Sequence, residues 1–198
     1  MKVAFATLGC KVNQSETQAM SELFVKAGYE VVDFEQKADV YIINTCSVTA
    51  VGEKKSRQMI SRAYKENPDA CIAVVGCYAQ RDPEGILAQC GVSLVVGTAQ
   101  KSRIVEFVEE YLQNRQKLKE VEDITHWSSY DDELAVHGHT GRTRAYVKIQ
   151  DGCNNFCAYC IIPYLRGRIR SRSMDSIIEE AKSLARNGFK EVVLNGIH

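Results

Sequence analysis

Short apolar runs alternate with amphipathic segments along residues 1–113. The apolar runs have the length of strands and lie at 2–6, 29–32, 40–44, 71–76 and 94–96. Helix-length segments with one apolar face lie between or after them, at 15–27, 51–66, 83–90 and 101–113. We expect Ser15 to cap the first helix and Gly28 to end it. Strands that alternate with helices predict an α/β fold with a parallel sheet.

One connection in this pattern is unusually short. The stretch between Val32 and Val40 cannot hold a full helix, whereas a parallel crossover normally takes a dozen or more residues. The link is therefore either one helical turn beneath the sheet, or the strand at 29–32 is poorly placed.

A second alternating pattern follows a polar stretch. Residues 114–140 are polar and acidic, and we interpret them as a linker with a partly buried Trp127. A strand at 144–150, a helix at about 174–187 with Ser173 or Asp175 near its cap, and a strand at 191–194 follow. This order is typical of the first units of a (β/α) barrel. The predicted domains are thus 1–113 and 141–198, joined by the linker.

Composition excludes several classes of protein. The chain has 25 basic and 25 acidic residues, so a nucleic-acid partner would have to meet a local basic patch. No apolar run approaches the ~20 residues of a membrane span, and the apolar stretch at the N-terminus is too short for a signal peptide. Eight cysteines in such a chain indicate reduced thiols and metal ligation. We expect a cytoplasmic protein with no membrane partner.

Three of the cysteines, Cys153, Cys157 and Cys160, form a C-x-x-x-C-x-x-C run. Structural zinc usually takes four ligands, and no fourth cysteine lies nearby. A [4Fe–4S] cluster held by three thiolates keeps one iron open for a substrate. Zinc and an ordinary ferredoxin-like site remain alternatives. The spacing, with Tyr159 before the third cysteine, resembles that of radical S-adenosylmethionine (SAM) enzymes.

Cys10, Cys46 and Cys77 share another position, because each follows the carboxyl end of a predicted strand. In the flavodoxin-like strand order 2-1-3-4-5 these three strands are neighbours, and open α/β sheets bind ligands at that edge. The three thiols could therefore meet and hold a second cluster, or they could be buried packing residues like many cysteines. Cys71 and Cys90 lie away from that edge, and we interpret both as packing residues.

The surroundings of these cysteines resemble the N-terminal domain of the radical SAM methylthiotransferases. The resemblance rests on three stretches: Leu8-Gly9-Cys10-Lys11-Val12-Asn13-Gln14, Asn44-Thr45-Cys46-Ser47-Val48-Thr49 and Val75-Gly76-Cys77-Tyr78-Ala79-Gln80. It implies a flavodoxin-like methylthiotransferase domain followed by a radical SAM (β/α) partial barrel.

The same resemblance implies two [4Fe–4S] clusters and SAM as cofactors. Cys10, Cys46 and Cys77 would hold an auxiliary cluster, and the C-x-x-x-C-x-x-C loop would hold the cluster that binds SAM. In this family, reductive cleavage of SAM gives a 5′-deoxyadenosyl radical, and a methylated sulfur is then transferred to a substrate carbon to form a C–S bond.

The form Gly-Cys-Lys-Val-Asn-Gln around Cys10 is most like the branch that acts on threonylcarbamoyladenosine beside the anticodon of tRNA. The isopentenyladenosine branch typically has Gln-Met-Asn after this cysteine, and the ribosomal-protein aspartate branch has Pro-Lys-Asn. The implied partners are tRNA and a reductant such as flavodoxin or ferredoxin. The chain has about half the usual length of the family, so we expect it to be inactive alone.

Four arginines follow the cluster loop at alternate positions and would share one side of an extended segment. They suit the SAM carboxylate or an RNA phosphate, or they form a solvated basic loop. With Tyr159, three of them are candidate cofactor-binding residues, namely Arg166, Arg168 and Arg170, and the fourth is Arg172. The linker histidines are weaker candidates for ligands: His126, His137 and His139. Alternative functions are a two-cluster electron-transfer protein and a zinc-stabilised RNA-binding module.

Overall fold

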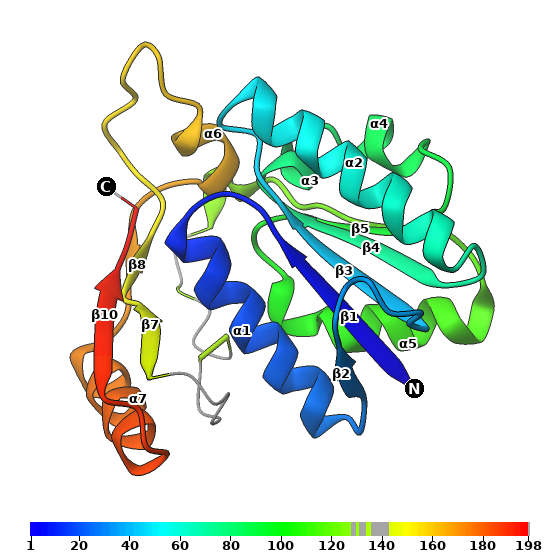
Figure 1. Cartoon of the computed structure of the whole chain (residues 1–198). Coiled ribbons are helices and arrows are strands. Elements are labelled where there is room, and N and C mark those ends of the chain that lie inside the picture. The colour runs from blue at the N-terminus through cyan, green and yellow to red at the C-terminus, as the bar shows by residue number, and fades with distance from the viewer. Residues whose placement is uncertain (128–129, 131–133, 136–142, 198) are drawn as a thin grey trace.

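A six-stranded parallel sheet forms the centre of the first part of the molecule (Figure 1). The computed structural model describes residues 1–127, 130, 134–135 and 143–197. The strand order is β2-β1-β3-β4-β5-β6, which confirms the predicted order 2-1-3-4-5 and adds one strand. The strands are β1 (Lys2–Thr7), β2 (Glu30–Val32), β3 (Val40–Thr45), β4 (Cys71–Gly76), β5 (Val92–Val96) and β6 (Leu118–Glu120).

Helices cover both faces of this sheet (Figure 1). On one face, α1 (Lys11–Lys26) and α5 (Ile104–Asn114) pack Phe24 and Phe107 against alternate strand residues such as Ile42. The other face is covered by α2 (Ala50–Glu66), α3 (Cys77–Arg81) and α4 (Pro83–Leu87). Because both faces are buried, β3 and β4 are buried along their whole length, as is usual in parallel sheets.

The short link between β2 and β3 crosses β1 by a single turn. The amide of Gln36 donates to the carbonyl of Asp33 over 3.0 Å, and the Tyr41 hydroxyl donates to the carbonyl of Gln36 over 2.8 Å. Phe34 packs edge-on against the ring of Tyr41. Buried side chains under the turn therefore replace the helix that a crossover normally needs, and the strand at Glu30–Val32 is confirmed.

Two details of the first part differ from the sequence-based expectation. The helix α1 begins at Lys11, with Cys10 at its N-cap position, so the predicted cap at Ser15 is wrong. The hydroxyl of Ser15 instead donates to the carbonyl of Val12 within the helix. The predicted linker also contributes β6, which pairs with β5. The domain boundaries themselves stay a prediction.

The second part consists of a parallel strand pair with one covering helix. The pair is β7 (Arg144–Lys148) with β10 (Glu191–Asn195), and the helix is α7 (Met174–Arg186), capped by Ser173 as expected. Three shorter elements lie between β7 and α7: β8 (Gln150–Asp151), α6 (Ile162–Arg166) and β9 (Arg170–Ser171). This is the predicted order of strand, long loop, helix and strand.

The second part packs against the first along α1 (Figure 1). Ala145 and Val147 of β7 are fully buried and belong to the same apolar core as Met20 of α1. The hydroxyl of Thr98, after β5, donates to the carbonyl of Leu165 in α6 over 2.7 Å. Within the described residues, no helix is long and apolar enough to cross a membrane.

Candidate functional site

Three cysteines lie at the carboxyl edge of the six-stranded sheet. Cys10 follows β1 and occupies the N-cap position of α1, Cys46 follows β3, and Cys77 follows β4 as the first residue of α3. Because β1, β3 and β4 are adjacent and parallel, their carboxyl ends reach the same edge. The sheet thus places all three thiols where open α/β sheets bind ligands.

Two glycines allow the backbone to come close at this edge. Gly9, with φ of +101°, lies against Cys46, and a Cβ at Gly9 would be 2.9 Å from the Cβ of Cys46. Gly76, with φ of +95°, lies against the neighbouring strand end, and a Cβ there would be 2.6 Å from the Oδ1 of Asn44. Both the positive φ and the lack of space require glycine directly before Cys10 and Cys77.

The three thiols also interact electrostatically. Burial raises the pKa of the Cys46 thiol, and the charges of Cys77 and Cys10 raise the pKa further. Arg166 acts in the opposite direction and lowers the pKa of Cys46. Cys46 therefore lies within reach of the charges of both other cysteines and of one arginine from the second part of the chain.

Asn13 holds two of the cysteine loops together. Its Nδ2 donates to the carbonyl of Leu8 over 2.7 Å and to the carbonyl of Thr45 over 3.0 Å. Its Oδ1 accepts a contact of 3.8 Å from the Sγ of Cys10 and a hydrogen bond of 2.7 Å from Nη2 of Arg166. One buried amide thus connects the loops before Cys10 and Cys46 with α6.

Asn44 has a similar position at the end of β3. Its Nδ2 donates to the carbonyl of Asn13 over 3.0 Å. Its Oδ1 lies beside Gly76 and accepts from Nζ of Lys101 over 3.5 Å. The loop before Cys77 is therefore in contact with the same polar core as the other two loops.

A group of buried charges, which we call the buried ion network, lies directly behind these loops. Within the part of the chain that the structure describes, the network contains two carboxylates, Glu16 and Asp151. Nη1 of Arg166 lies 3.0 Å from Oε1 of Glu16 and 3.0 Å from Oδ1 of Asp151. Lys148 also contacts both, at 2.9 Å and 3.1 Å, and Lys101 pairs with Glu16. All five residues are at most 8% exposed. Glu16 and Lys101 belong to the first part, so the network joins the two parts.

In this network, the opposite charges affect the pKa values more than burial does. Burial alone would raise the pKa of Glu16, but Arg166, Lys101 and Lys148 hold it well below the usual range. The same balance of burial against Arg166 and Lys148 lowers the pKa of Asp151 to about 2. Burial alone would lower the pKa of Lys148, whereas Asp151 and Glu16 raise it. Glu16, Asp151 and Lys148 are therefore charged at neutral pH.

The loop with the other three cysteines leaves the edge beside α6. Its base is held by the amide of Cys153, which donates to the carbonyl of Gly167 over 3.1 Å, and by Asn154, whose Oδ1 accepts from the amide of Ile169. Within the loop, the amide of Cys160 donates to the carbonyl of Cys157 over 2.9 Å. Cys153 is buried, Cys157 is exposed and Cys160 is half-buried. A group held here would be reachable from solvent on one side.

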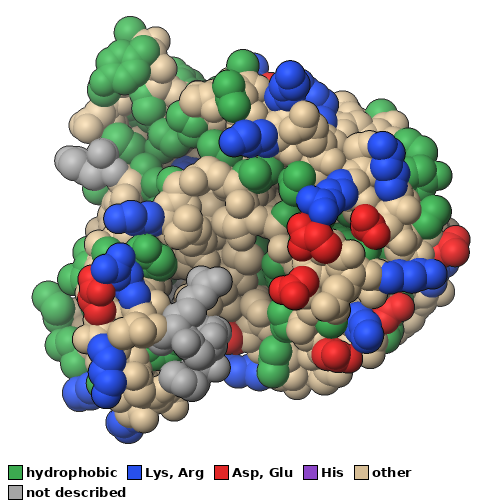
Figure 2. Space-filling view, viewed as in Figure 1, with side chains coloured by type: hydrophobic (Ala, Val, Ile, Leu, Met, Phe, Trp, Pro, Cys, Tyr) green, Lys and Arg blue, Asp and Glu red, His purple; other side chains and the backbone are tan. Residues whose placement is uncertain are grey.

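The tip of this loop exposes aromatic rings (Figure 2). Tyr159 is 93% exposed, and Phe156 packs edge-on against Tyr164 of α6 with both rings still in solvent. The expectation that Tyr159 contacts a cofactor therefore stays a prediction.

The four arginines after the loop do not share one side, so that expectation is wrong. The segment is not extended, because α6 ends at Arg166 and Gly167 follows with φ of +72°. Arg166 is buried in the ion network, and Arg172 is buried against Glu180. Nη2 of Arg170 donates to the carbonyl of Arg166 over 2.9 Å, and Arg168 is exposed. Arg168 has the position expected of a solvent-facing basic residue.

Cys71 and Cys90 do not join the edge. Cys71 is fully buried at the start of β4, as expected for a packing residue. Cys90 is exposed, so its interpretation as a buried residue is wrong. It contacts Tyr64, and this hydrogen bond raises the pKa of the tyrosine. His137 and His139 lie outside the described residues, as does the side chain of His126.

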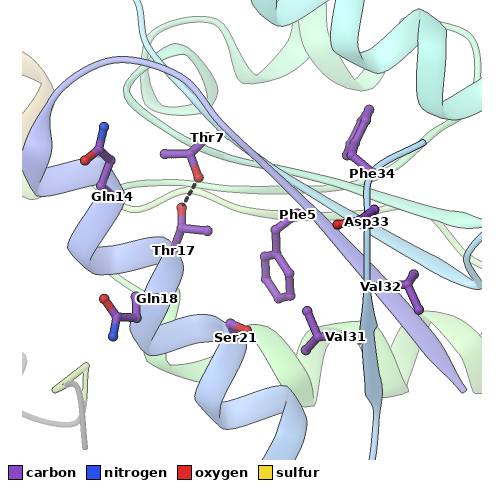
Figure 3. A pocket seen from close by; sticks show the side chains of 10 residues that line it. All are labelled: Phe5, Thr7, Gln14, Thr17, Gln18, Ser21, Val31, Val32, Asp33 and Phe34. Atoms are coloured by element: carbon purple, nitrogen blue, oxygen red, sulfur yellow. Dashed lines mark hydrogen bonds between the residues drawn. The ribbon is translucent and has the colours of Figure 1, made fainter. Parts of the chain in front are cut away.

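A groove of about 580 Å³ lies between α1 and β2 (Figure 3). Phe5 and Val31 form an apolar part, and the hydroxyl of Thr7 donates to the hydroxyl of Thr17 over 2.9 Å. Gln14 lies at one end. None of the residues that line the groove is a cysteine, so it is separate from the cysteine edge.

The chemistry of the two donor sets fits iron–sulfur clusters. Among the described residues, no three His, Cys, Asp or Glu side chains are gathered closely enough to hold one metal ion. Each cysteine set also offers three soft thiolates, the usual ligands of iron–sulfur clusters. The glycine-lined edge and the loop beside α6 therefore fit such groups.

Sequence patterns did not reveal the polar residues behind the edge. Asn13 and Asn44 lie within stretches that resemble the family, but their roles depend on contacts between different loops. Glu16 and Arg166 are 150 residues apart in the chain. Only the fold brings them together, so no local pattern could have identified the pair.

Comparisons with known proteins agree with this geometry. Residues 2–97 match the Uncharacterized protein family UPF0004, and residues 147–196 match the Radical SAM superfamily. Threonylcarbamoyladenosine tRNA methylthiotransferase MtaB from Bacillus subtilis is 53% identical over 99% of this chain and 43% of its own length. The protein of the same name from Aquifex aeolicus is 46% identical over 99% of the chain and 48% of its own length.

A relative with another substrate is less similar. Ribosomal protein uS12 methylthiotransferase RimO from Trichodesmium erythraeum is 37% identical over 97% of this chain and 43% of its own length. The chain thus spans less than half the length of these relatives. The two matched families and the alignments over nearly the whole chain lead to one conclusion. Over nearly its whole length, the chain is similar to radical SAM methylthiotransferases, and its two matched segments are those of UPF0004 and of the Radical SAM superfamily.

Proposed function

We propose that this chain provides the two cluster sites of an enzyme that methylthiolates threonylcarbamoyladenosine in tRNA. The observation that carries the proposal is the arrangement of two sets of three cysteines on neighbouring surfaces. One set lies at the carboxyl ends of β1, β3 and β4, and the other lies in the loop before α6. α6 contacts α3, which begins at Cys77, so the two sites are adjacent.

Each set would hold one [4Fe–4S] cluster. Cys10, Cys46 and Cys77 are proposed as ligands of the auxiliary cluster, and the set Cys153, Cys157 and Cys160 as ligands of the cluster that binds SAM. When bound, the clusters would supply reductive cleavage of SAM and the site from which sulfur reaches the substrate carbon.

The protein residues position these groups and control access to them. Asn13 fixes the backbone before Cys10 and Cys46. The buried ion network fixes α6, and with it the base of the second cysteine loop, against the sheet. Cys157 faces solvent, where SAM and substrate could approach. Exposed Tyr159 and Arg168 are proposed to contact SAM or RNA there, and Arg170 is retained as a weaker candidate.

The proposed substrate rests on similarity between sequences. The two relatives named for threonylcarbamoyladenosine are 53% and 46% identical to the chain, and the one named for ribosomal protein uS12 is 37% identical. With this substrate, the partners would be tRNA and a one-electron reductant such as flavodoxin or ferredoxin. A protein with eight free cysteines that acts on tRNA would work in the reducing cytoplasm.

A chimaera tests the proposal. This chain would replace the aligned part of the Bacillus subtilis relative, in a strain that lacks that enzyme, and tRNA nucleosides would be measured by mass spectrometry. We expect methylthiolated threonylcarbamoyladenosine from the chimaera and from its Cys90→Ala variant. The Cys46→Ala and Cys157→Ala variants should each abolish it. Full product from either of these two variants would contradict the assigned sites.

A further inference from the structure

The buried ion network has an excess of positive charge. Among the described residues it contains three cations, Lys101, Lys148 and Arg166, and two carboxylates, Glu16 and Asp151. All five are at most 8% exposed, so water can screen this charge only weakly. An uncompensated buried charge is strongly unfavourable. The excess therefore calls for a negative partner nearby.

The contacts of the network lead toward the three strand-end cysteines. Arg166 donates to Asn13 over 2.7 Å, and the same oxygen of Asn13 faces the Sγ of Cys10. Lys101 contacts Asn44, which touches the glycine before Cys77.

We propose that Arg166 and Lys101 supply the positive charge that balances a thiolate-bound cluster at Cys10, Cys46 and Cys77, and thereby raise its reduction potential. This inference rests on the proposed function, which assigns a cluster to these cysteines. Three thiolates give such a group a net negative charge, and reduction adds one more electron. A fixed buried cation stabilises the reduced form more than the oxidised form. Arg166 is thus a positioning residue that acts through charge.

A purely structural role makes a different prediction. If the network only joins α6 to the sheet, neutralising any of its members should loosen the site without a preferred direction of the potential. If its charge acts on the cluster, removing a cation and removing a carboxylate should move the potential in opposite directions. The sign of the shift therefore separates the two roles.

The experiment isolates one site in the whole chain. A parent protein with Cys153→Ala, Cys157→Ala and Cys160→Ala would keep only the strand-end site. Its iron and sulfide content would be measured after anaerobic reconstitution, and the reduction potential would be followed by electron paramagnetic resonance. The test variants are Arg166→Gln, which removes a positive charge, Arg166→Lys, which keeps it, and Glu16→Gln, which removes a negative charge. Arg172→Gln is the matched control, because this arginine is also buried but pairs with Glu180.

We expect Arg166→Gln to shift the reduction equilibrium about tenfold toward the oxidised form, as for one charge acting over about 12 Å at an effective dielectric constant near 20. Tenfold corresponds to 59 mV for one electron. Glu16→Gln should shift it in the opposite direction, whereas Arg166→Lys and Arg172→Gln should stay near the parent. If Glu16→Gln does not fold, the Lys101→Gln variant is measured instead. Its reduction potential should shift in the same direction as that of Arg166→Gln.

The outcomes separate the inference from the proposed function. A reconstituted parent without iron and sulfide would overturn the assignment of a cluster to these cysteines. A parent with a cluster whose potential is unchanged in Arg166→Gln, or shifts equally in Arg166→Gln and Arg172→Gln, would overturn the role of charge alone. Loss of the cluster from a folded Arg166→Gln protein, with full loading of Arg166→Lys, would support the same need for positive charge.

Discussion

Glu16 is the residue whose neutralisation should most disturb the contact between the two parts of the chain. Its carboxylate is 1% exposed and lies among three cations. The Glu16→Gln substitution keeps the size of the side chain but leaves those cations with one carboxylate, Asp151. Removing one partner of a buried ion pair typically costs about 3–5 kcal/mol of unfolding free energy. We expect a loss of this size in metal-free protein.

Urea unfolding followed by circular dichroism measures this loss. With an m-value of about 2 kcal/mol per molar urea, the midpoint should fall by about 1.5–2.5 M with an unchanged slope. Glu106→Gln is the control, because Glu106 forms an exposed pair with Arg103, and its midpoint should not change measurably. The double variant Glu16→Gln, Lys101→Met should recover part of the loss, since it removes one of the cations left without a partner.

A loss below about 1 kcal/mol for Glu16→Gln, the range of exposed ion pairs, would refute the reasoning. It would mean that water or movement of the chain compensates the unpaired cations. Additive losses in the double variant would also contradict the direct pairing of Glu16 with Lys101.

Further substitutions test the cysteine edge and its packing. Gly9→Ala should destabilise the protein by about 1–3 kcal/mol in urea unfolding, because its φ is positive and the new Cβ would lie 2.9 Å from the Cβ of Cys46. Gly28→Ala is the matched control with positive φ but nothing within 4 Å, so it should cost less; an equal loss would contradict the close approach at Gly9. Cys71→Ala should cost roughly 1 kcal/mol through packing and leave iron content after reconstitution unchanged. A drop in iron would identify Cys71 as a ligand.

Five of the six strands could be predicted because each is a short apolar run, and β3, β4 and β5 are buried along their whole length. β6 lies in the polar stretch and lacks this signal. β4, for example, has the predicted bounds Cys71–Gly76. Local signals also fixed the cap at Ser173 and the stop at Gly28. The helix α1 begins four residues before Ser15 because the strand-end turn at Gly9 leads directly into it. The turn at Gly9 depends on its contact with Cys46, after β3. The sequence around Gly9 alone does not show this contact.

In the candidate site, the positions of the cysteines could be predicted and the roles of the arginines could not. The positions of Cys10, Cys46 and Cys77 followed from the strand order, because parallel neighbours end at one edge. The alternating arginines were misjudged, since the extended segment that would align them is interrupted by α6 and Gly167. The carboxylates that bury Arg166 come from elements far apart in the chain. Spacing alone could not distinguish a buried structural arginine from a binding residue.

Iron and sulfide analysis of the anaerobically reconstituted chain tests the central claim most directly. The claim is that the strand-end cysteines hold one cluster and that the loop with Cys153, Cys157 and Cys160 holds another. The unaltered chain should therefore bind about eight irons, four in each cluster. A variant with alanine at Cys10, Cys46 and Cys77 should bind about four, and a variant with alanine at Cys71 and Cys90 should still bind about eight. Unchanged iron in the first variant, or a loss of about four irons in the second, would contradict the account.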